Sequence, residues 1–554
     1  MFRFIILFFS FPLFLFAQQN KEGSIRGNFQ TDFQVLQEDT LISAYAEDFP
    51  EKFLYMAFGN LTYTKGDFQA GIRFESYESP LLGYPSGYTG NTGIPYRYIS
   101  YKVKDLTITL GNYYEQFGSG LIFRTYEERN LGYDNAMEGV KLEYEAINGI
   151  KLKGIIGKQR SYFEKGNGVL RGLDIDISLN DLIKKWENCK TQIVLGSGFI
   201  SKYEEDRNPT YKLPENVGAW ANRLTINRGF WNFYSEYAYK INDPSAVNNY
   251  IYKPGNALVF NTTYAKKGLG ILLSAKRIDN MNFRSEVNAQ SNDLLINYLP
   301  AFNKQHTYSL PALYPYATQA NGEIGLQAEI IYKLKKGSFL GGKYGTNISV
   351  NFSNAHAIDK TPINDTVSIG QSGTLGYESN FLKIGDEKYF QDINIEISKK
   401  VSKKFSFIAS YINIYYNKDI IEDYNEYGSI NGNIIVLDGL YKIKPMHSLR
   451  FEYQHMLAKQ EENTSPERGD WVMGLIEYTF APHWFIAVQD QFNYGNPIEN
   501  KQLHYYTISI GYTKGANRFI LNYGKQQEGI FCVGGVCRNV PASSGFSMSI
   551  TSSF

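Results

Sequence analysis

Short runs in which apolar and polar residues alternate recur along the whole chain. Clear examples are 106–110, 173–177, 326–330, 393–397 and 449–453. A period of two places successive side chains on opposite faces of a β-strand, so each run predicts a strand with one apolar and one polar face. Counting these runs predicts about 24 strands, within a range of about 20 to 26, from Ser24 to Phe554.

The connections between the predicted strands alternate in length. Segments 65–66 and 148–149 are short, whereas 80–95, 279–321 and 353–388 are long. Lysines gather in the short connections and acidic residues in several long ones. Outer-membrane barrels have short turns on the periplasmic side and long loops on the outer side. Loop length and charge agree on which end of the barrel is which. Together with the alternation, they predict an all-β protein, a single large antiparallel transmembrane β-barrel with long, partly inward-folded extracellular loops.

The N-terminus has the features of an export signal. Arg3 is followed by an apolar run over 4–16 and by the small residue Ala17. This run is shorter than the roughly 20 apolar residues that a membrane-spanning helix needs, and its flanks are typical of a cleaved signal peptide. We expect residues 1–17 to be removed near Ala17 and residues 18–554 to form a barrel in the outer membrane. The short distance to the first strand predicts no N-terminal plug domain.

Composition supports a membrane barrel. The chain holds 44 Tyr and 37 Phe, yet its mean hydropathy is only −0.34. Aromatic girdles at both interfaces explain these rings, and no apolar stretch is long enough for a membrane helix. A secreted array of β-sandwiches is the alternative, and the paired pattern of loop length and charge argues against it. The formal net charge of +1 gives no case for a nucleic-acid partner,. The expected contacts are outer-membrane lipid and glycolipid.

The last predicted strand resembles an assembly signal. Four apolar residues share one parity along it and the chain ends on Phe. They are Phe546, Met548, Ile550 and Phe554. This pattern is similar to the C-terminal strand by which the barrel-assembly machinery recognises its substrates, so that machinery is an expected partner during insertion.

The cysteines predict one disulfide and no metal site. Cys532 and Cys537 flank a Val-Gly-Gly-Val tip that permits closure in an oxidising compartment, whereas Cys189 has no partner in sequence,. A metal site needs more ligands than these residues offer. The six His are scattered, and neither an H-E-x-x-H nor a G-x-S-x-G motif is present,. We therefore expect no catalytic site, no metal and no cofactor.

Segment 111–141 interrupts the alternation. It combines turn-forming glycines with the apolar triplet 121–123 and a dense set of charges. The charged residues are Glu115, Arg124, Glu127, Glu128, Arg129 and Asp134. In a solvated loop this apolar triplet would be exposed to bulk water, which is unfavourable, so the segment is unlike a solvated loop. We predict that 118–135 folds into the lumen, finds partners on a wall of mixed charge, and sets a pore constriction lined by these six charged residues.

The long segment 279–321 is a second candidate for filling the lumen. Pro300, Pro311 and Pro315 are interleaved with tyrosines. This composition predicts an ordered, irregular loop, because flexible loops are rich in Gly and Ser or in charge. Its sequence is equally compatible with an inward fold and with an outer lid.

The stretches YYEQFGSGLIFRTYEERNLGYDNAMEGV and NYLPAFNKQHTYSLPALYPYAT resemble recurring segments of an uncharacterised family of Bacteroidota outer-membrane β-barrel proteins. The resemblance covers the mature chain and implies a barrel in the outer membrane, with no reaction and no substrate. The expected function is a passive, loop-restricted porin-like channel for small solutes. The alternative is a structural or assembly subunit that binds other envelope proteins through its outer loops.

Overall fold

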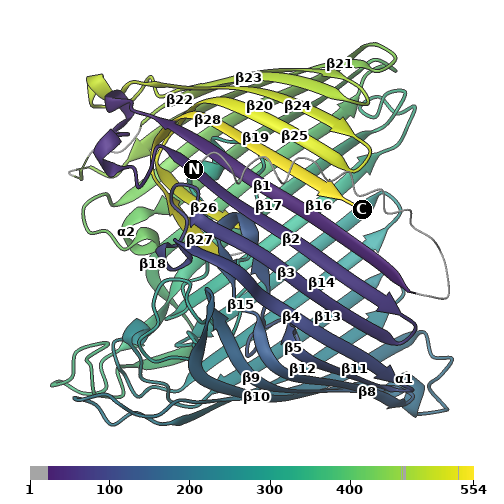
Figure 1. Ribbon diagram of the computed structural model, residues 1–554, viewed down its shortest axis with the longest axis vertical. Helices are drawn as coiled ribbons and strands as arrows, with labels where there is room; N and C mark the ends of the chain where they lie inside the picture. Colours follow the sequence, from purple (N-terminus) through teal and green to yellow (C-terminus); the bar gives the residue numbers. More distant parts are fainter. Residues whose placement is uncertain (1–22, 463, 466–468, 534–535) are drawn as a thin grey trace.

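The computed structural model describes residues 23–462, 464–465, 469–533 and 536–554 (Figure 1). A single 24-stranded sheet contains every long strand, and each strand pairs antiparallel with its neighbour along the chain. The sheet closes on itself because β1 pairs with β2 on one side and with β28 on the other. The predicted barrel and its strand number are therefore confirmed. Closure leaves no free sheet edge, which a wall facing hydrocarbon requires.

The barrel strands follow one another in chain order, each joined to the next by a turn or loop. They are β1 (Ser24–Gln37), β2 (Phe53–Lys65), β3 (Phe68–Ser79), β4 (Asn91–Val103), β5 (Leu106–Tyr113), β8 (Met137–Ile147), β9 (Ile150–Ser161), β10 (Glu164–Ser178), β11 (Thr191–Tyr203), β12 (Asn216–Arg228), β13 (Trp231–Lys240), β14 (Gly255–Lys266), β15 (Leu269–Asp279), β16 (Glu323–Leu334), β17 (Thr346–Thr361), β18 (Glu378–Lys400), β19 (Phe405–Asn417), β20 (Ser429–Lys444), β21 (His447–Gln460), β22 (Trp471–Phe480), β23 (Trp484–Phe492), β24 (His504–Lys514), β25 (Asn517–Gln526) and β28 (Ser543–Ser553).

Small elements lie in the connections. Two short hairpins are formed by β6 (Glu127–Glu128) with β7 (Tyr133–Asp134), and by β26 (Gly529–Val533) with β27 (Val536–Val540). The helices are α1 (Leu179–Leu182), α2 (Lys418–Glu422) and the single turns η1 (Thr40–Ile42), η2 (Ala46–Asp48), η3 (Ser86–Tyr88), η4 (Arg129–Leu131), η5 (Ala246–Asn248), η6 (Pro311–Leu313) and η7 (Glu499–Lys501). Within the described residues, no helix is long and apolar enough to cross a membrane.

The two ends of the barrel differ, as the sequence predicts. Figure 1 shows tight turns and α1 at one end, which we call the turn end, and α2 with the large loops at the other, the loop end. One expected loop is corrected. Segment 353–388 is largely strand, because β17 runs on to Thr361 and β18 already begins at Glu378. This hairpin extends the sheet beyond neighbouring strands at the loop end.

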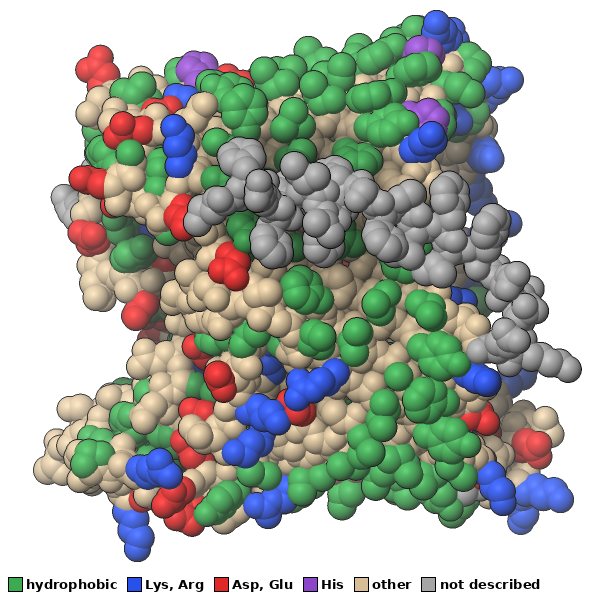
Figure 2. All heavy atoms as spheres, in the orientation of Figure 1, with side chains coloured by type: hydrophobic (Ala, Val, Ile, Leu, Met, Phe, Trp, Pro, Cys, Tyr) green, Lys and Arg blue, Asp and Glu red, His purple; other side chains and the backbone are tan. Residues whose placement is uncertain are grey.

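Alternation along each strand separates the outer face from the lumen. On β18, Ile393 and Ile395 are 40% and 41% exposed, whereas the intervening Asn394 is 3% exposed and faces inward. Figure 2 shows many hydrophobic side chains on the visible outer face of the wall, with most of the charged side chains toward its two ends. An outward apolar belt on a closed antiparallel wall is the arrangement of a transmembrane barrel.

Candidate functional site: a lumen filled by loops

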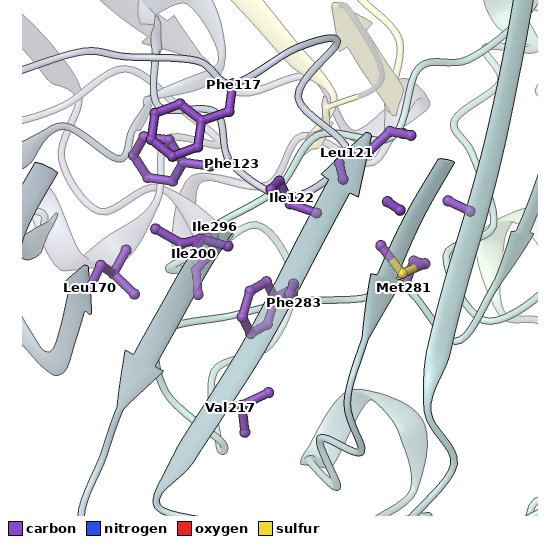
Figure 3. Packing of buried hydrophobic residues seen from close by; sticks show 14 of the residues in the cluster. Phe117, Leu121, Ile122, Phe123, Leu170, Ile200, Val217, Met281, Phe283 and Ile296 are labelled. Atoms are coloured by element: carbon purple, nitrogen blue, oxygen red, sulfur yellow. The ribbon is translucent and has the colours of Figure 1, made fainter. Parts of the chain in front are cut away.

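The connection between β5 and β8 lies inside the barrel. Its residues Phe117, Leu121, Ile122 and Phe123 are fully buried. They pack on inward-facing apolar side chains of β9 to β15, and Figure 3 shows several of these contacts. The wall residues are Ile155, Leu170, Ile200, Val217, Ala219, Ala221, Ala238, Ala257, Val259 and Ile278. We call residues 114–136 the first loop.

The turn at Phe117–Gly120 aims the apolar triplet at the wall. Gly118 has a φ of +53° and Gly120 a φ of +98°, conformations that side-chain-bearing residues rarely adopt,. The fully buried carboxylate of Glu236 on β13 accepts a hydrogen bond from the Ser119 amide at 2.7 Å. A Cβ on Gly118 would lie 2.5 Å from this carboxylate. Glycine is therefore needed for two separate reasons at position 118.

Ion pairs hold the outer half of the first loop to β3 and β9. Arg73 contacts Glu75 at 2.6 Å and Glu127 at 2.7 Å, and also pairs with Asp134. Arg160 contacts Asp134 at 2.6 Å and Glu75 at 2.5 Å. These side chains are buried or nearly so, and buried charges require such partners,. The network joins two wall strands through the loop.

The other predicted constriction residues are mostly anchored. Glu115 binds Lys153 at 2.7 Å and Lys141 at 3.3 Å, and Arg129 binds Glu127 at 3.0 Å. The guanidinium of Arg124 lies over the rings of Tyr126 and Tyr298, 4.3 Å and 4.0 Å from their centroids.

Glu128 differs from these residues. It is half-buried, and no hydrogen bond or ion pair of its side chain is found in the described part of the chain. The structure thus gathers the six predicted residues in one loop, where most brace the loop. Their effect on a constriction stays a prediction.

The connection between β15 and β16, residues 280–322, also enters the lumen; we call it the second loop. Met281, Phe283 and Ile296 are fully buried and join the apolar cluster of the first loop. Backbone bonds tie the loops together, since Tyr298 donates to Gly120 at 2.9 Å and Arg124 donates to Ile296 at 2.8 Å. Of the two placements open from the sequence, the inward fold is the one observed.

The second loop then reaches a different part of the wall. His306 lies 2.6 Å from Asp392 on β18, and Lys304 lies 3.8 Å from Glu396. Farther on, Leu310, Tyr314 and Tyr316 pack on inward-facing apolar residues of β17 to β22. The wall residues of this cluster are Ala355, Tyr389, Phe390, Ile412, Ile414, Tyr416, Ile430, Ile434, Val436, Met456, Trp471 and Met473. The second loop therefore bridges two regions of the barrel interior.

Arg284 holds the outer part of the second loop in shape. Its guanidinium donates to the carbonyls of Gln290 at 3.0 Å, Ser291 at 2.6 Å and Asp293 at 2.6 Å. Burial lowers the pKa of Arg284 to about 10, partly offset by Tyr133 and Asp293, so the residue is still charged at neutral pH. Carbonyls that converge on one charged side chain make an irregular segment rigid.

Polar cavities lie on both sides of the first loop. An outer cavity of about 320 Å³ is lined by Asp134, Arg160, Asp293 and Arg538 among others. An inner cavity of about 610 Å³ extends toward the turn end and is lined by residues that include Lys153, Asp174 and Arg223. Arg223 pairs with Asp174 at 2.7 Å and with Asp176 at 2.7 Å. Both cavities therefore present charges of both signs.

Several anchors on the wall were not predicted from the sequence. Glu236 caps the turn of the first loop, and Lys276 on β15 pairs with Glu323 on β16 at 2.7 Å with both side chains fully buried. Lys276 also donates to the Pro300 carbonyl at 2.7 Å, which fixes the base of the second loop. The alternation along each strand indicates that these side chains point inward, but it does not indicate which loop each would contact.

Two predicted features lie elsewhere in the fold. The β26–β27 hairpin places Cys532 opposite Cys537 in register, but the side chains of 531–537 lie outside what the structure describes, so the disulfide stays a prediction. Cys189 is a free, exposed thiol. On the closing strand, Phe546 is 42% exposed, and the Phe554 backbone exchanges two 3.0 Å hydrogen bonds with Gly27. Among the described residues, no group of three His, Cys, Asp or Glu side chains could hold a metal ion.

Comparisons with known proteins assign no activity to the chain. No curated protein matches it. Similar solved structures include the siderophore receptor PirA from Pseudomonas aeruginosa, at 8% identity and a TM-score of 0.39 over 96% of this chain and 80% of that chain. The E. coli P pilus tip assembly intermediate PapC-PapD-PapK-PapG matches at 9% identity and a TM-score of 0.47, over 96% of this chain and 60% of that chain. A mutant Rh. blastica porin matches at 13% identity and a TM-score of 0.24, over 65% of this chain and 100% of that chain.

Similarity at this level is too distant to transfer a ligand or a partner. The family comparison covers the whole chain, because residues 1–554 match a family of unknown function, DUF6029. The sequence resemblance to a family without assigned activity is confirmed to that extent. This chain belongs to the family of unknown function DUF6029.

Proposed function

We propose that this protein is an outer-membrane β-barrel that acts as a passive, loop-restricted porin-like channel for small solutes. The position of the first loop carries the proposal, since it lies in the lumen between two polar cavities. The expected export signal at 1–17 and the outward apolar belt support a location in the outer membrane,. The proposed origin in the Bacteroidota rests only on the sequence resemblance.

The charges along this path favour weak selectivity. Asp134 and Arg160 face the outer cavity, and Lys153 and Asp174 face the inner one. A strongly selective pore places one sign of charge at its narrowest point. Paired charges of both signs instead give a polar path for small hydrophilic solutes of either charge. The proposal includes no reaction and no cofactor, because function must be argued from a site.

Single-channel recording of the purified full-length barrel in planar bilayers tests the channel role. We expect small, steady conductance steps from heat-modifiable, folded protein, with a permeability ratio for K⁺ and Cl⁻ close to one. Liposome swelling with sugars of increasing size then gives the cut-off set by the loops. A folded barrel that shows neither ion conductance nor sugar flux would contradict the channel role.

A second candidate function is a binding subunit of a larger envelope complex. The β17–β18 hairpin projects at the loop end and exposes Leu375, Phe381, Leu382 and Ile384, with exposed fractions of 58%, 41%, 86% and 50%. Clustered exposed apolar residues mark interaction surfaces. The oligomeric state in mild detergent separates the two candidates: a stable hetero-complex from native membranes favours the subunit, and a monomer or homotrimer favours the channel.

A further inference from the structure

The wall of the barrel has a notch at the loop end above β5 and β8. Pairing of β4 with β5 ends at Tyr98 and Gly111, and pairing of β5 with β8 ends at Tyr113 and Met137. By contrast, β4 continues to pair with β3 up to Asn91. The first loop leaves the wall at this point and turns into the lumen. The wall on either side of β5 and β8 therefore extends farther toward the loop end than these two strands do.

The notch is a cavity of about 160 Å³ that opens on the outer face of the barrel. Ile94, Pro95 and Arg97 on β4 form one side, and Phe163, Glu164 and Lys165 at the β9–β10 tip form the other. Asn112 and Glu138 form the floor, and Arg160 also lines the notch. The Asn112 amide oxygen accepts the Arg97 backbone N–H at 2.9 Å, so the free edge of β4 is satisfied where its partner strand ends.

Cations gather around this notch on the membrane-facing surface. Lys165 lies 2.8 Å from Glu138 and Arg97 lies 3.4 Å from the same carboxylate. Lys158 stands directly opposite Glu138 on β9. The side chains of Arg97 and Lys165 remain 55% and 53% exposed, so both cations are accessible to a ligand from outside the barrel. Glu164 is the second carboxylate here, which leaves an excess of positive charge.

The residues just below the notch belong to the apolar belt. Ile99, Leu110, Val140 and Ile156 form one cross-strand row, in which Ile99, Leu110 and Ile156 are 48%, 44% and 49% exposed. Arg97, Glu138 and Lys158 each lie two residues from this row on β4, β8 and β9, on its loop-end side and with the same outward parity. The charged residues therefore stand where hydrocarbon meets head groups, at the loop end of the wall.

We propose that this notch binds a phosphate group of an anionic glycolipid in the outer leaflet. Arg and Lys side chains bind phosphate oxygens through charge-assisted hydrogen bonds, and basic pockets at membrane interfaces bind lipid head groups. The apolar row lies where acyl chains would continue from a head group held in the notch. A charged cluster facing pure hydrocarbon would be unfavourable, and a phosphate supplies the missing partner. The inference rests on the proposed membrane location and not on channel activity.

Native mass spectrometry of the delipidated full-length protein in detergent tests this site. The probes are lipid A carrying two phosphates and the same lipid A without phosphates, both with EDTA so that no divalent cation bridges the lipid to an acidic side chain. We expect the phosphorylated lipid to bind more tightly, and the double variant Arg97→Gln, Lys165→Gln to weaken it by about tenfold or more. Glu138→Gln should tighten binding, because it removes the carboxylate that competes for both cations.

The double variant Lys266→Gln, Lys267→Gln is the matched control, since it removes two exposed positive charges at the turn end. Equal affinity of the notch variant and this control for phosphorylated lipid A would overturn the proposal, as would equal binding of both lipids. If millimolar inorganic phosphate binds as tightly as the lipid and displaces it, the notch is a free-phosphate site. Bilayer conductance is measured separately, so loss of lipid binding and loss of channel activity remain distinguishable.

Discussion

Phe117 and Phe123 offer the sharpest test of how the first loop is held in the lumen. Both rings are fully buried, and their centroids lie 5.0 Å apart. Phe117 sits beside Gly172 and Gly198, where an added Cβ would meet it at 2.8 Å and 3.6 Å. Replacing a buried Phe by Ala typically costs about 3–5 kcal/mol. Because the rings touch, the two effects will not add fully.

The wall should survive this double substitution. The 24-stranded ladder closes through β1 and β28 without the first loop, so Phe117→Ala with Phe123→Ala removes packing inside the barrel and leaves every strand pair intact. Even the cost of one ring, about 4 kcal/mol, shifts the ratio of docked to undocked loop roughly a thousandfold. We expect larger and noisier conductance steps and faster entry of bulky antibiotics. Substitution is preferable to deleting 121–131, which would also remove the loop's bonds to the second loop.

Cysteine labelling reports the loop position independently of conductance. Ile122 is fully buried, so Ile122→Cys, with the three native cysteines replaced by Ser, should resist a water-soluble maleimide. The same site should react once both rings are removed. Phe199→Ala is the control, since Phe199 faces outward on β11 and is 44% exposed. If the barrel lacking both rings folds, keeps the introduced thiol protected and conducts as before, the idea that apolar packing holds the loop inside is refuted.

Three further predictions concern the wall, the cysteines and the charged anchors. Ile393→Arg and Ile395→Arg should each cost about 2–4 kcal/mol because they place charge on the outward belt near mid-membrane. Ser398 on β18 shares the inward parity of Asn394 and is half-buried, so Ser398→Arg should be tolerated; equal loss of heat-modifiable barrel from both classes would reject the assigned faces. In mature protein without reductant, a thiol reagent should modify Cys189 alone, and additional labelling at Cys532 and Cys537 would reject their disulfide. Glu127→Gln breaks contacts with Arg73 and Arg129 and should raise conductance noise. The neighbouring Glu128→Gln should change only the K⁺ to Cl⁻ permeability ratio. If the two variants give the same conductance noise, the ion pairs do not brace the loop.

The alternating pattern predicts the wall except at the loop end of β17 and β18, where the sequence predicts a loop and the structure forms strand. The sequence places the first strand at Ser24 and the last near Phe554, and the structure has β1 at Ser24–Gln37 and β28 at Ser543–Ser553. A two-residue period depends only on neighbouring residues and on which solvent each face meets. For that reason it needs no knowledge of distant contacts.

The apolar part of the lumen was not predicted. The sequence predicts an inner face of mixed charge, but Val217, Ala219 and Ala221 face inward on β12 and are covered by the loops. The signal was present as weakened alternation, since the run Ala219-Trp220-Ala221 is apolar on both faces. Strands buried on both sides lose their polar face. Nothing local in β12 indicates which distant segment covers it.

The charged residues of the first loop illustrate the same limit. The composition of 118–135 correctly indicates burial, because an apolar triplet and unpaired charges both need partners. It does not indicate that Asp134 would meet Arg73 and Arg160, which lie on strands far away in sequence. Local sequence identifies residues that need partners, whereas barrel topology and loop direction decide which partners they find.

The contacts between the loops favour a fixed restriction over a gate. The first loop is attached to β3 and β9 by ion pairs, to β13 through Glu236 and to the second loop by backbone hydrogen bonds. The second loop is in turn attached to β18 through His306 and Asp392. Moving one loop would expose the apolar face of the other and of the wall, so the energetic cost would not be confined to a hinge. A gate needs two arrangements of similar free energy, whereas these shared contacts stabilise one arrangement. For the channel proposed above, these contacts predict a constant conductance over a wide range of voltage.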